Sequence, residues 1–285
     1  MRNVKWKLSV IFGTYNRAAV LRRCIEAIRK DLDGRNYEIV VTDGGSTDGS
    51  REWLAVQDDV VLVGLRHLGG AVEAFNHAYA ASRGDFIATL NDDAAPVGGA
   101  LRNGVEFLLH RASAGQVAIR LERTRGAEPK VEILYPGSAY ANFGVVRRKA
   151  LEQVVRIQGG FWNPCYRTYG ADCELSAWLH HLGWGVDPME DPALGYIEDY
   201  EVHDVLRREN HTQGRAQRDG QLFWKRWGGD THAMLRGKLK PNVTEAELRR
   251  LGEVVAEPSV RAAEPDLEVD AGRPPAETPE TSTVE

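Results

Sequence analysis

The chain has few cysteines and no long apolar run, and both absences limit what it can be. Its 285 residues include only Cys24, Cys165 and Cys173, whose spacing fits neither a zinc site nor a disulfide framework. No stretch approaches the roughly 20 apolar residues that cross a bilayer. Residues 1–7 lead directly into a predicted strand and lack the apolar region of a signal peptide. We therefore expect a cytoplasmic protein with no integral membrane segment.

An excess of charge of one sign is also missing from most of the chain. The net charge is −5, and residues 253–285 alone hold nine acidic and two basic residues. The rest is nearly neutral, so charge offers no argument for nonspecific nucleic-acid binding. Residues 257–285 hold five prolines among Glu, Thr and Ser. Because this composition buries too little apolar surface to fold, we expect a disordered, acidic, proline-rich tail.

Apolar runs alternate with amphipathic stretches over residues 1–96. Short apolar runs predict four strands, and the stretches between them predict three helices. The four runs are 8–12, 37–42, 60–65 and 86–90. Strands that alternate with helices form βαβ units and a parallel sheet. Because such crossovers are right-handed, the carboxyl ends of the strands meet at one edge, where open sheets bind ligands.

After residue 96 the pattern loosens into helices and strands with long polar connections. Helical spacing of apolar residues is found at 100–109, 149–157, 171–182, 213–227 and 244–255. Strand-like runs are found at 117–121, 131–135 and 143–147, with shorter ones at 184–186 and 194–197. We therefore expect an α/β protein in which residues 97–256 form a second, mixed half of the same domain.

An acidic pair follows the fourth strand directly. Asn91, Asp92 and Asp93 stand just past the apolar run 86–90. Two carboxylates this close repel each other unless a cation or hydrogen-bond donors face them. Oxygen ligands at a strand end suit Mg²⁺ or Mn²⁺ together with substrate phosphates. The alternative is that the pair only caps a helix or forms a turn before Pro96.

Polar residues also follow the first two strands. Thr14, Asn16 and Arg17 come after the first, and Asp43 comes after the second. Such a loop can hold a nucleotide, with Arg17 near phosphate and Asp43 accepting from a base or a ribose. The alternatives are a helix cap at Thr14 or Asn16 and a plain turn at Asp43. The first strand is not followed by Gly-x-Gly-x-x-Gly, which counts against a dinucleotide enzyme.

Taken together, these segments resemble family 2 glycosyltransferases of the GT-A fold. The resemblance rests on the order and spacing of the stretches 9–17, 38–49, 69–76 and 84–93. It implies a GT-A fold, a Rossmann-like, mostly parallel sheet flanked by helices. It also implies a nucleotide-sugar-binding half over 1–96 and an acceptor-binding and catalytic half over 97–256. The activity it implies is metal-dependent, inverting transfer of a sugar from a nucleotide diphosphate, with UDP favoured, to an acceptor hydroxyl.

The resemblance also assigns roles in the first half. It implies that Thr14, Asn16 and Asp43 face the nucleoside, and that Asn76 helps to hold the donor.

Asn91-Asp92-Asp93 takes the place of the family's Asp-x-Asp motif. The resemblance makes Asp93 the ligand of Mn²⁺ or Mg²⁺ and places Asp92 near the ribose. Asn91 departs from the motif, and we expect it to contact the donor.

In the second half, residues 169–175 resemble the family's Gly-Glu-Asp-x-Asp-Leu signature, with Ala171 in place of Glu. The resemblance makes Asp172 the general base that takes a proton from the acceptor hydroxyl. It implies a histidine after this region as a further metal ligand; we choose His203, with His211 as the alternative. The alternative is that Asp172 is a helix N-cap and Glu174 a first-turn partner of the helix dipole.

Three alternatives to sugar transfer remain open. A nucleotidyltransferase of similar fold would need a basic, Gly-rich loop after the first strand. A signalling receiver domain would need its acidic pair there, where this chain has Thr14 and Tyr15. A catalytically silent nucleotide-sugar-binding protein would agree with Ala171. The sequence fits several kinds of acceptor: a glycan, a lipid-linked sugar, a protein, a small molecule or a modified nucleic acid.

Overall fold

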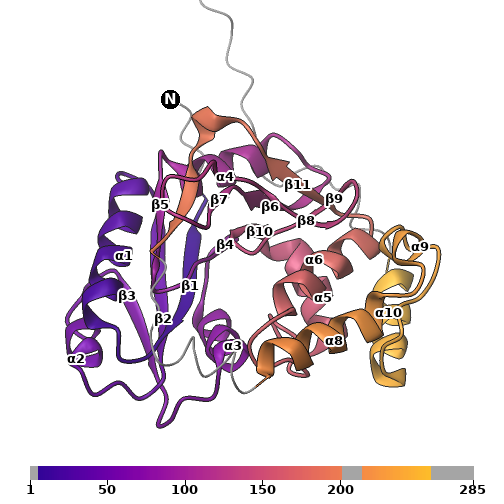
Figure 1. Ribbon diagram of the computed structural model, residues 1–285, viewed down its shortest axis with the longest axis horizontal. Helices are drawn as coiled ribbons and strands as arrows, with labels where there is room; N and C mark the ends of the chain where they lie inside the picture. The colour runs from indigo at the N-terminus through magenta and orange to yellow at the C-terminus, as the bar shows by residue number, and fades with distance from the viewer. Residues whose placement is uncertain (1–5, 201–213, 258–285) are drawn as a thin grey trace, which may run out of the picture.

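A seven-stranded sheet forms the centre of the molecule. This computed structural model describes residues 6–200 and 214–257, and Figure 1 shows the arrangement. The strand order is β11-β6-β10-β4-β1-β2-β3. The strands are β1 (Leu8–Thr14), β2 (Tyr37–Asp43), β3 (Val60–Gly64), β4 (Phe86–Thr89), β6 (Ala114–Ile119), β10 (Gly144–Arg147) and β11 (Gly185–Met189).

The first four strands run parallel, as predicted. β1 pairs with β2 on one side and with β4 on the other, and β2 pairs with β3. Strand order therefore reverses between β1 and β4, and a crevice opens at their carboxyl ends. β10 runs antiparallel to both β4 and β6, whereas β11 runs parallel to β6. The predicted α/β fold with a mixed second half is confirmed.

Helices flank this sheet because its central strands are apolar on both faces. All four residues of β4 are buried, as are six of the seven in β1. In Figure 1 the strands β1 and β2 lie between α1 and α3, while α5, α6, α8, α9 and α10 gather at the other end. The helices are α1 (Ala18–Asp31), α2 (Ser50–Leu54), α3 (Ala71–Ala81), α4 (Ala100–Leu109), α5 (Arg148–Gln158), α6 (Ala171–His181), α8 (Arg215–Trp227), α9 (Thr231–Leu235) and α10 (Glu245–Ala256).

Amphipathic spacing explains the longer helices. In α1, Leu21, Cys24, Ile25 and Ile28 recur at helical spacing and are fully buried. The helix α10 begins with a capping box, in which Thr244 and the third helical residue bond each other's backbone. Local sequence thus predicts where these helices lie, and packing of their apolar faces stabilises them.

A small second sheet extends from the acidic turn. It consists of β5 (Ala94–Val97), β12 (Tyr196–Asp199) and β7 (Leu121–Glu122), in the order β5-β12-β7. β5 is absent from the sequence-based prediction, because Pro96 argues against a strand. It is an edge strand of its sheet, which is where proline is tolerated. A hairpin of β8 (Glu132–Tyr135) and β9 (Ser138–Tyr140) and a short turn of 3₁₀ helix (Pro192–Leu194) complete the fold.

Two predictions fall outside the described residues. The tail predicted to be disordered lies there from residue 258 onward, and so does the whole segment 201–213 that contains His203.

Candidate active site

The crevice between β1 and β4 brings the predicted acidic pair against the loop after β1. Thr14 donates a hydrogen bond to Asp92 Oδ2 at 2.7 Å. Nη1 of Arg17 donates to Asp92 Oδ1 at 2.7 Å and to Asp93 Oδ2 at 3.0 Å. The two carboxylates are nearly buried, with exposed fractions of 4% and 6%. Arg17 therefore offsets the mutual repulsion of the pair, and Thr14 fixes the orientation of Asp92.

The acidic pair does lie in a turn, as one alternative predicted. The amide of Ala94 donates to the carbonyl of Asn91 at 3.3 Å, which closes the turn between β4 and β5. Asn91 is exposed. The turn leaves the carboxylates of Asp92 and Asp93 able to bind a ligand, because both side chains line a cavity.

The loop after β2 uses Asp43 and Asn16 for its own structure. Asp43 is fully buried and accepts from the amides of Gly45 and Ser46 at 3.1 Å. Asn16, at a φ of 52°, accepts from the amide of Thr47 at 2.8 Å. The two loops at the sheet edge are thereby tied together, and neither predicted side chain is among those that line the cavity.

Asn76 also acts on the backbone. Its amide group donates to the carbonyl of Trp162 at 3.0 Å and accepts from the amide of the same residue at 2.9 Å. This pair of bonds holds Trp162, which lines the cavity while Asn76 does not. Asn76 therefore holds a cavity residue in place and does not itself face the cavity.

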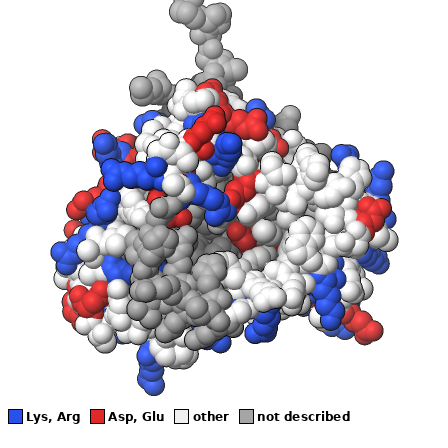
Figure 2. Space-filling view, in the orientation of Figure 1, with Lys and Arg blue, Asp and Glu red and all other residues white. Residues whose placement is uncertain are grey.

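A cavity of about 540 Å³ joins the two halves of the chain. Figure 2 shows acidic atoms in a hollow near the centre of one face, beside a run of basic side chains. Six of the predicted site residues line the cavity, and they come from both halves. They are Thr14, Arg17, Asn91, Asp92, Asp93 and Asp172. The crevice thus unites residues that lie nearly 160 positions apart.

Asp172 occupies the first turn of α6. The N-cap is Gly170, so the alternative in which Asp172 caps the helix does not match the geometry. Asp172 accepts from the amide of Cys173 at 2.9 Å. Burial raises the pKa of Asp172 to about 6, and Glu132 adds to the rise although the Cys173 amide opposes it. A carboxylate with this pKa is ionised near neutral pH and still basic enough to take a proton.

Tyr140 of the β8–β9 hairpin and Arg123, which follows β7, line a part of the cavity that sequence reasoning missed. Both donate to the carboxylate of Glu132 in β8. Burial raises the pKa of Tyr140 well above its usual range, and the nearby Cys173, Asp172 and Glu132 add to the rise. No motif marks these residues, because the hairpin approaches α6 only in the folded chain.

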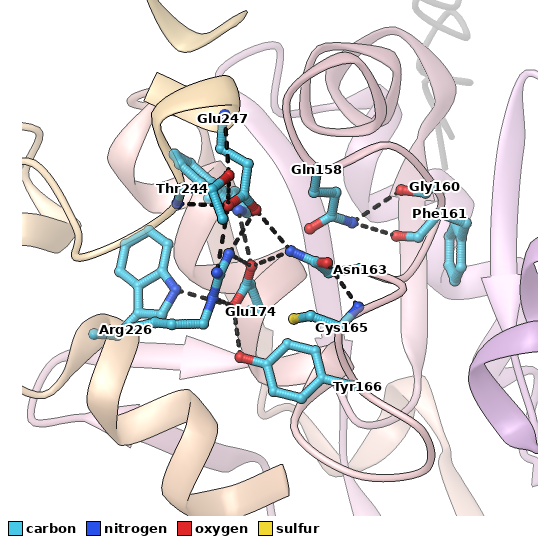
Figure 3. Close-up of polar contacts among 12 residues, drawn as sticks. Gln158, Gly160, Phe161, Asn163, Cys165, Tyr166, Glu174, Arg226, Thr244 and Glu247 are labelled. Atoms are coloured by element: carbon cyan, nitrogen blue, oxygen red, sulfur yellow. Dashed lines mark hydrogen bonds and ion pairs between the residues drawn. The ribbon is translucent and has the colours of Figure 1, made fainter. Parts of the chain in front are cut away.

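Glu174, two residues after Asp172, belongs to a different environment. It is fully buried, and its carboxylate lies where α6, α8 and the loop after α5 meet (Figure 3). Its donors are Asn163, Tyr166, Trp178, Arg226 and Trp227, at 2.5 to 3.3 Å. Arg226 also donates to Glu247 at 2.6 Å. With every lone pair engaged, Glu174 is unsuited to proton transfer.

No group of three or more His, Cys, Asp and Glu side chains within 6–200 and 214–257 is arranged to hold a metal. Asp92 and Asp93 provide two carboxylates, and His203 lies outside these ranges. Among the helices of the described part, none combines the length and apolar character that a membrane crossing needs.

Comparison with known families decides the chain's affiliation. The family profile described as "Glycosyl transferase family 2" matches residues 9–162, more than half of the chain. The chain belongs to glycosyl transferase family 2. The resemblance predicted from four short stretches is thereby confirmed.

Two curated relatives agree over a shorter region. One is glycosyltransferase GlyG of Streptococcus pneumoniae serotype 4, 31% identical over 90 residues. The other is an uncharacterized glycosyltransferase of a Nostoc strain, 33% identical over 91 residues. Each alignment covers 30% of this chain, and it covers 30% and 28% of these relatives, respectively. The chain thus matches less than a third of either relative's length.

Solved structures extend the likeness in fold to most of the chain. The mannosyltransferase PcManGT of Pyrobaculum calidifontis, in complex with GDP-Man and Mn²⁺, has a TM-score of 0.54 at 18% identity. That match covers 89% of this chain and 76% of PcManGT. Residues 1–349 of S. aureus TarS in complex with UDP give 0.59 at 15% identity, covering 87% and 70%. The predicted GT-A-like fold is therefore confirmed.

Proposed function

We propose that this family 2 protein transfers a sugar from a nucleotide diphosphate donor to an acceptor hydroxyl. The favoured donor is a UDP-sugar, and the transfer inverts the configuration of the anomeric carbon. One observation carries the proposal. The acidic pair Asp92–Asp93 and the carboxylate of Asp172 line the same cavity, although they come from different halves of the chain. In this proposal residues 1–96 bind the donor, and residues 97–256 bind the acceptor and supply the base.

The donor occupies the crevice at the carboxyl ends of β1 and β4. Thr14, Arg17 and Trp162 line this space, together with Gly44 from the loop that Asn16 and Asp43 hold. Asn76 in turn holds Trp162 through two hydrogen bonds. Support for a pyrimidine or purine diphosphate comes from the solved neighbours, one of which holds UDP and another GDP-Man.

The acidic pair fits Mn²⁺ or Mg²⁺. Both ions take oxygen ligands, and one or two carboxylates suffice when substrate phosphates supply others. Asp93 would hold the ion, with Asp92 beside it and His203 as a further ligand. A bound ion would offset charge on the leaving diphosphate. The mannosyltransferase neighbour was solved with Mn²⁺.

Asp172 acts as general base in this proposal. Its carboxylate lines the cavity, and burial keeps its pKa at about 6. It accepts the proton of an acceptor hydroxyl as that oxygen bonds to the sugar and the bond between the sugar and the diphosphate breaks, releasing the nucleotide diphosphate. Tyr140 and Arg123 bound the space that the acceptor enters.

A binding and turnover assay tests the proposal. UDP affinity is measured by calorimetry with and without Mn²⁺ in the wild type and in Asp93→Ala, and nucleotide sugars are screened for Mn²⁺-dependent hydrolysis. We expect Mn²⁺ to tighten UDP binding in the wild type but not in Asp93→Ala. Asp85→Ala is the control, since Asp85 is exposed at the opposite end of β4. Equal UDP affinity in all four measurements, together with no turnover of any donor, contradicts the proposal.

A further inference from the structure

A short backbone segment connects the donor half to the start of α6. Residues 167–169 line the cavity and lead directly into Gly170 and Asp172. On one side, the carbonyl of Arg167 accepts from the amide of Val72 in α3 at 3.3 Å. The contact is close: a Cβ on Gly70 would lie 2.9 Å from that carbonyl oxygen, so only glycine fits there.

On its other side the segment is held by one carboxylate, Asp219 of α8. Asp219 is 1% exposed, and its Oδ2 accepts from three consecutive amides. These are the amides of Arg167, Thr168 and Tyr169, at 3.2, 2.9 and 3.1 Å. Bonds from amides to an ionised carboxylate are stronger than bonds between neutral groups. Asp219 therefore holds the backbone of residues 167–169 in one conformation.

The segment determines where α6 begins. Gly170 has a φ of 78° and is the N-cap, and the amide of Glu174 donates to its carbonyl at 2.9 Å. A Cβ on Gly170 would lie 3.5 Å from the carbonyl oxygen of Asp219 and 3.6 Å from Cβ of Phe223. The turn into α6 is thus packed on α8, and Asp172 follows it by two residues. A shift of the segment would move Asp172 within the cavity.

We propose that Asp219 is a positioning residue for Asp172, acting through the backbone of 167–169. This inference rests on the proposed function, in which Asp172 is the base. Asp219 is not among the residues that line the cavity, so it acts without touching the substrate. No motif in the sequence marks it, because its bonds cross about 50 positions of the chain.

The chain offers a matched control in Asp31. Asp31 is also buried, at 6% exposed, and its Oδ2 accepts from two backbone amides at the start of α4. In Asp31 as in Asp219, the other carboxylate oxygen has no hydrogen-bond partner among the residues that the structure describes. Asp31 does not line the cavity. A variant of Asp31 thus reproduces the structural cost of losing such a carboxylate away from Asp172.

The test compares Asp219→Ala, Asp219→Asn and Asp31→Asn in the full chain. Hydrogen–deuterium exchange reports on the peptide that covers 167–170, and steady-state kinetics separates kcat from donor KM. In Asp219→Ala we expect faster exchange in that peptide, kcat lower by about 10²-fold, as a misplaced group can cause, and donor KM within about twofold. Asp219→Asn keeps an acceptor oxygen, so its kcat should lie between those of the wild type and Asp219→Ala.

A double variant distinguishes positioning from general structural damage. Asp219→Ala should lower kcat further by less than about twofold in an Asp172→Asn background, because no carboxylate remains to be positioned. Asp31→Asn should lower the melting temperature but leave kcat and the exchange of 167–170 unchanged. If Asp219→Ala does not fold, the test relies on Asp219→Asn. The inference is overturned if Asp219→Asn has the hydrogen exchange of the wild type in 167–170 and also its kcat.

The outcomes separate this inference from the proposed function. Faster exchange in Asp219→Ala with wild-type kcat contradicts the inference alone. The inference is also contradicted if the fold losses in kcat caused by Asp219→Ala and Asp172→Asn multiply in the double variant. A wild-type chain that turns over no nucleotide sugar contradicts the proposed function, and with it the catalytic part of this inference.

Discussion

Two places within residues 6–200 and 214–257 hold a pair of carboxylates joined by one arginine. Arg17 joins Asp92 and Asp93 at 2.7 and 3.0 Å, and Arg226 joins Glu174 and Glu247 at 2.6 Å each. In each place all three side chains are buried or nearly so. The two triads therefore solve the same electrostatic problem, yet their surroundings differ.

The difference lies in what surrounds the charges. All three members of the Arg17 triad line the cavity, whereas none of the Arg226 triad does. Burial opposes ionisation of Arg226, but its bonds to Glu174 and Glu247 outweigh that effect and raise its pKa. A closed triad of this kind links α6, α8 and α10. The open triad adjoins a space that a ligand can enter.

The same contrast recurs within one turn of α6. Asp172 lines the cavity, while Glu174, two residues on, is fully buried among aromatic and arginine donors. On a helix, residues two apart point in different directions. One turn thus supplies a carboxylate that lines the cavity and one that anchors the helix.

The largest effect is expected for Asp172→Asn. This change keeps the size of the side chain and removes the base, which typically contributes 10²–10⁴-fold in rate. Turnover should fall by about that factor, while UDP affinity and melting temperature stay near wild type. Surviving turnover would show that the base lies elsewhere, and lost UDP affinity would place Asp172 in the donor site.

Arg226→Ala should destabilise the fold strongly. It leaves Glu174 and Glu247 buried without their cation, which typically costs about 3–5 kcal/mol. Denaturant unfolding of Arg226→Ala and Lys225→Ala measures the effect, since Lys225 is exposed on the same helix. A loss no larger than that of Lys225→Ala would contradict the contrast between the two triads.

Arg17→Gln should strengthen Mn²⁺ binding in the absence of nucleotide. The guanidinium competes with a metal ion for Asp92 and Asp93, so its removal should tighten binding by up to about tenfold, or ~1.4 kcal/mol. Calorimetric titration with Mn²⁺ tests this, with Arg22→Gln, on an exposed position of α1, as the control. Weaker Mn²⁺ binding would mean that Arg17 supports the metal site.

The pH profile should have an acidic limb near pH 6. Asp172 must be ionised to accept a proton, and its pKa is raised to about 6. Turnover should therefore rise as pH increases through about 6 and level off above it. Measurement of kcat between pH 4.5 and 8 tests this, and the limb should be absent from the residual activity of Asp172→Asn.

The smallest effect is expected for a truncation after residue 256. It removes the acidic, proline-rich segment and the exposed ion pair between Arg156 and Glu257. Melting temperature and turnover should stay near wild type. A clear loss of either would show that the segment binds to the folded body.

Sequence patterns alone predicted where the strands of residues 1–96 end. The runs 8–12 and 86–90 are short, apolar and buried on both faces, and such a pattern is a local property of the chain. β5 was missed because Pro96 argues against a strand when its neighbours are unknown. The hairpin that carries Tyr140 was not linked to the site, because its approach to α6 depends on long-range packing.

What the sequence by itself determined is therefore the family, the alternation of strands and helices, and the chemical types at the sheet edge. These depend on neighbours along the chain and on motif spacing. Only the tertiary structure decided that Asp43 and Asn76 bond to backbone, that Glu174 is an anchor, and that Asp219 holds 167–169. Each of these roles depends on which groups meet a side chain in space, and burial decides whether its polar atoms bind the protein or face a ligand.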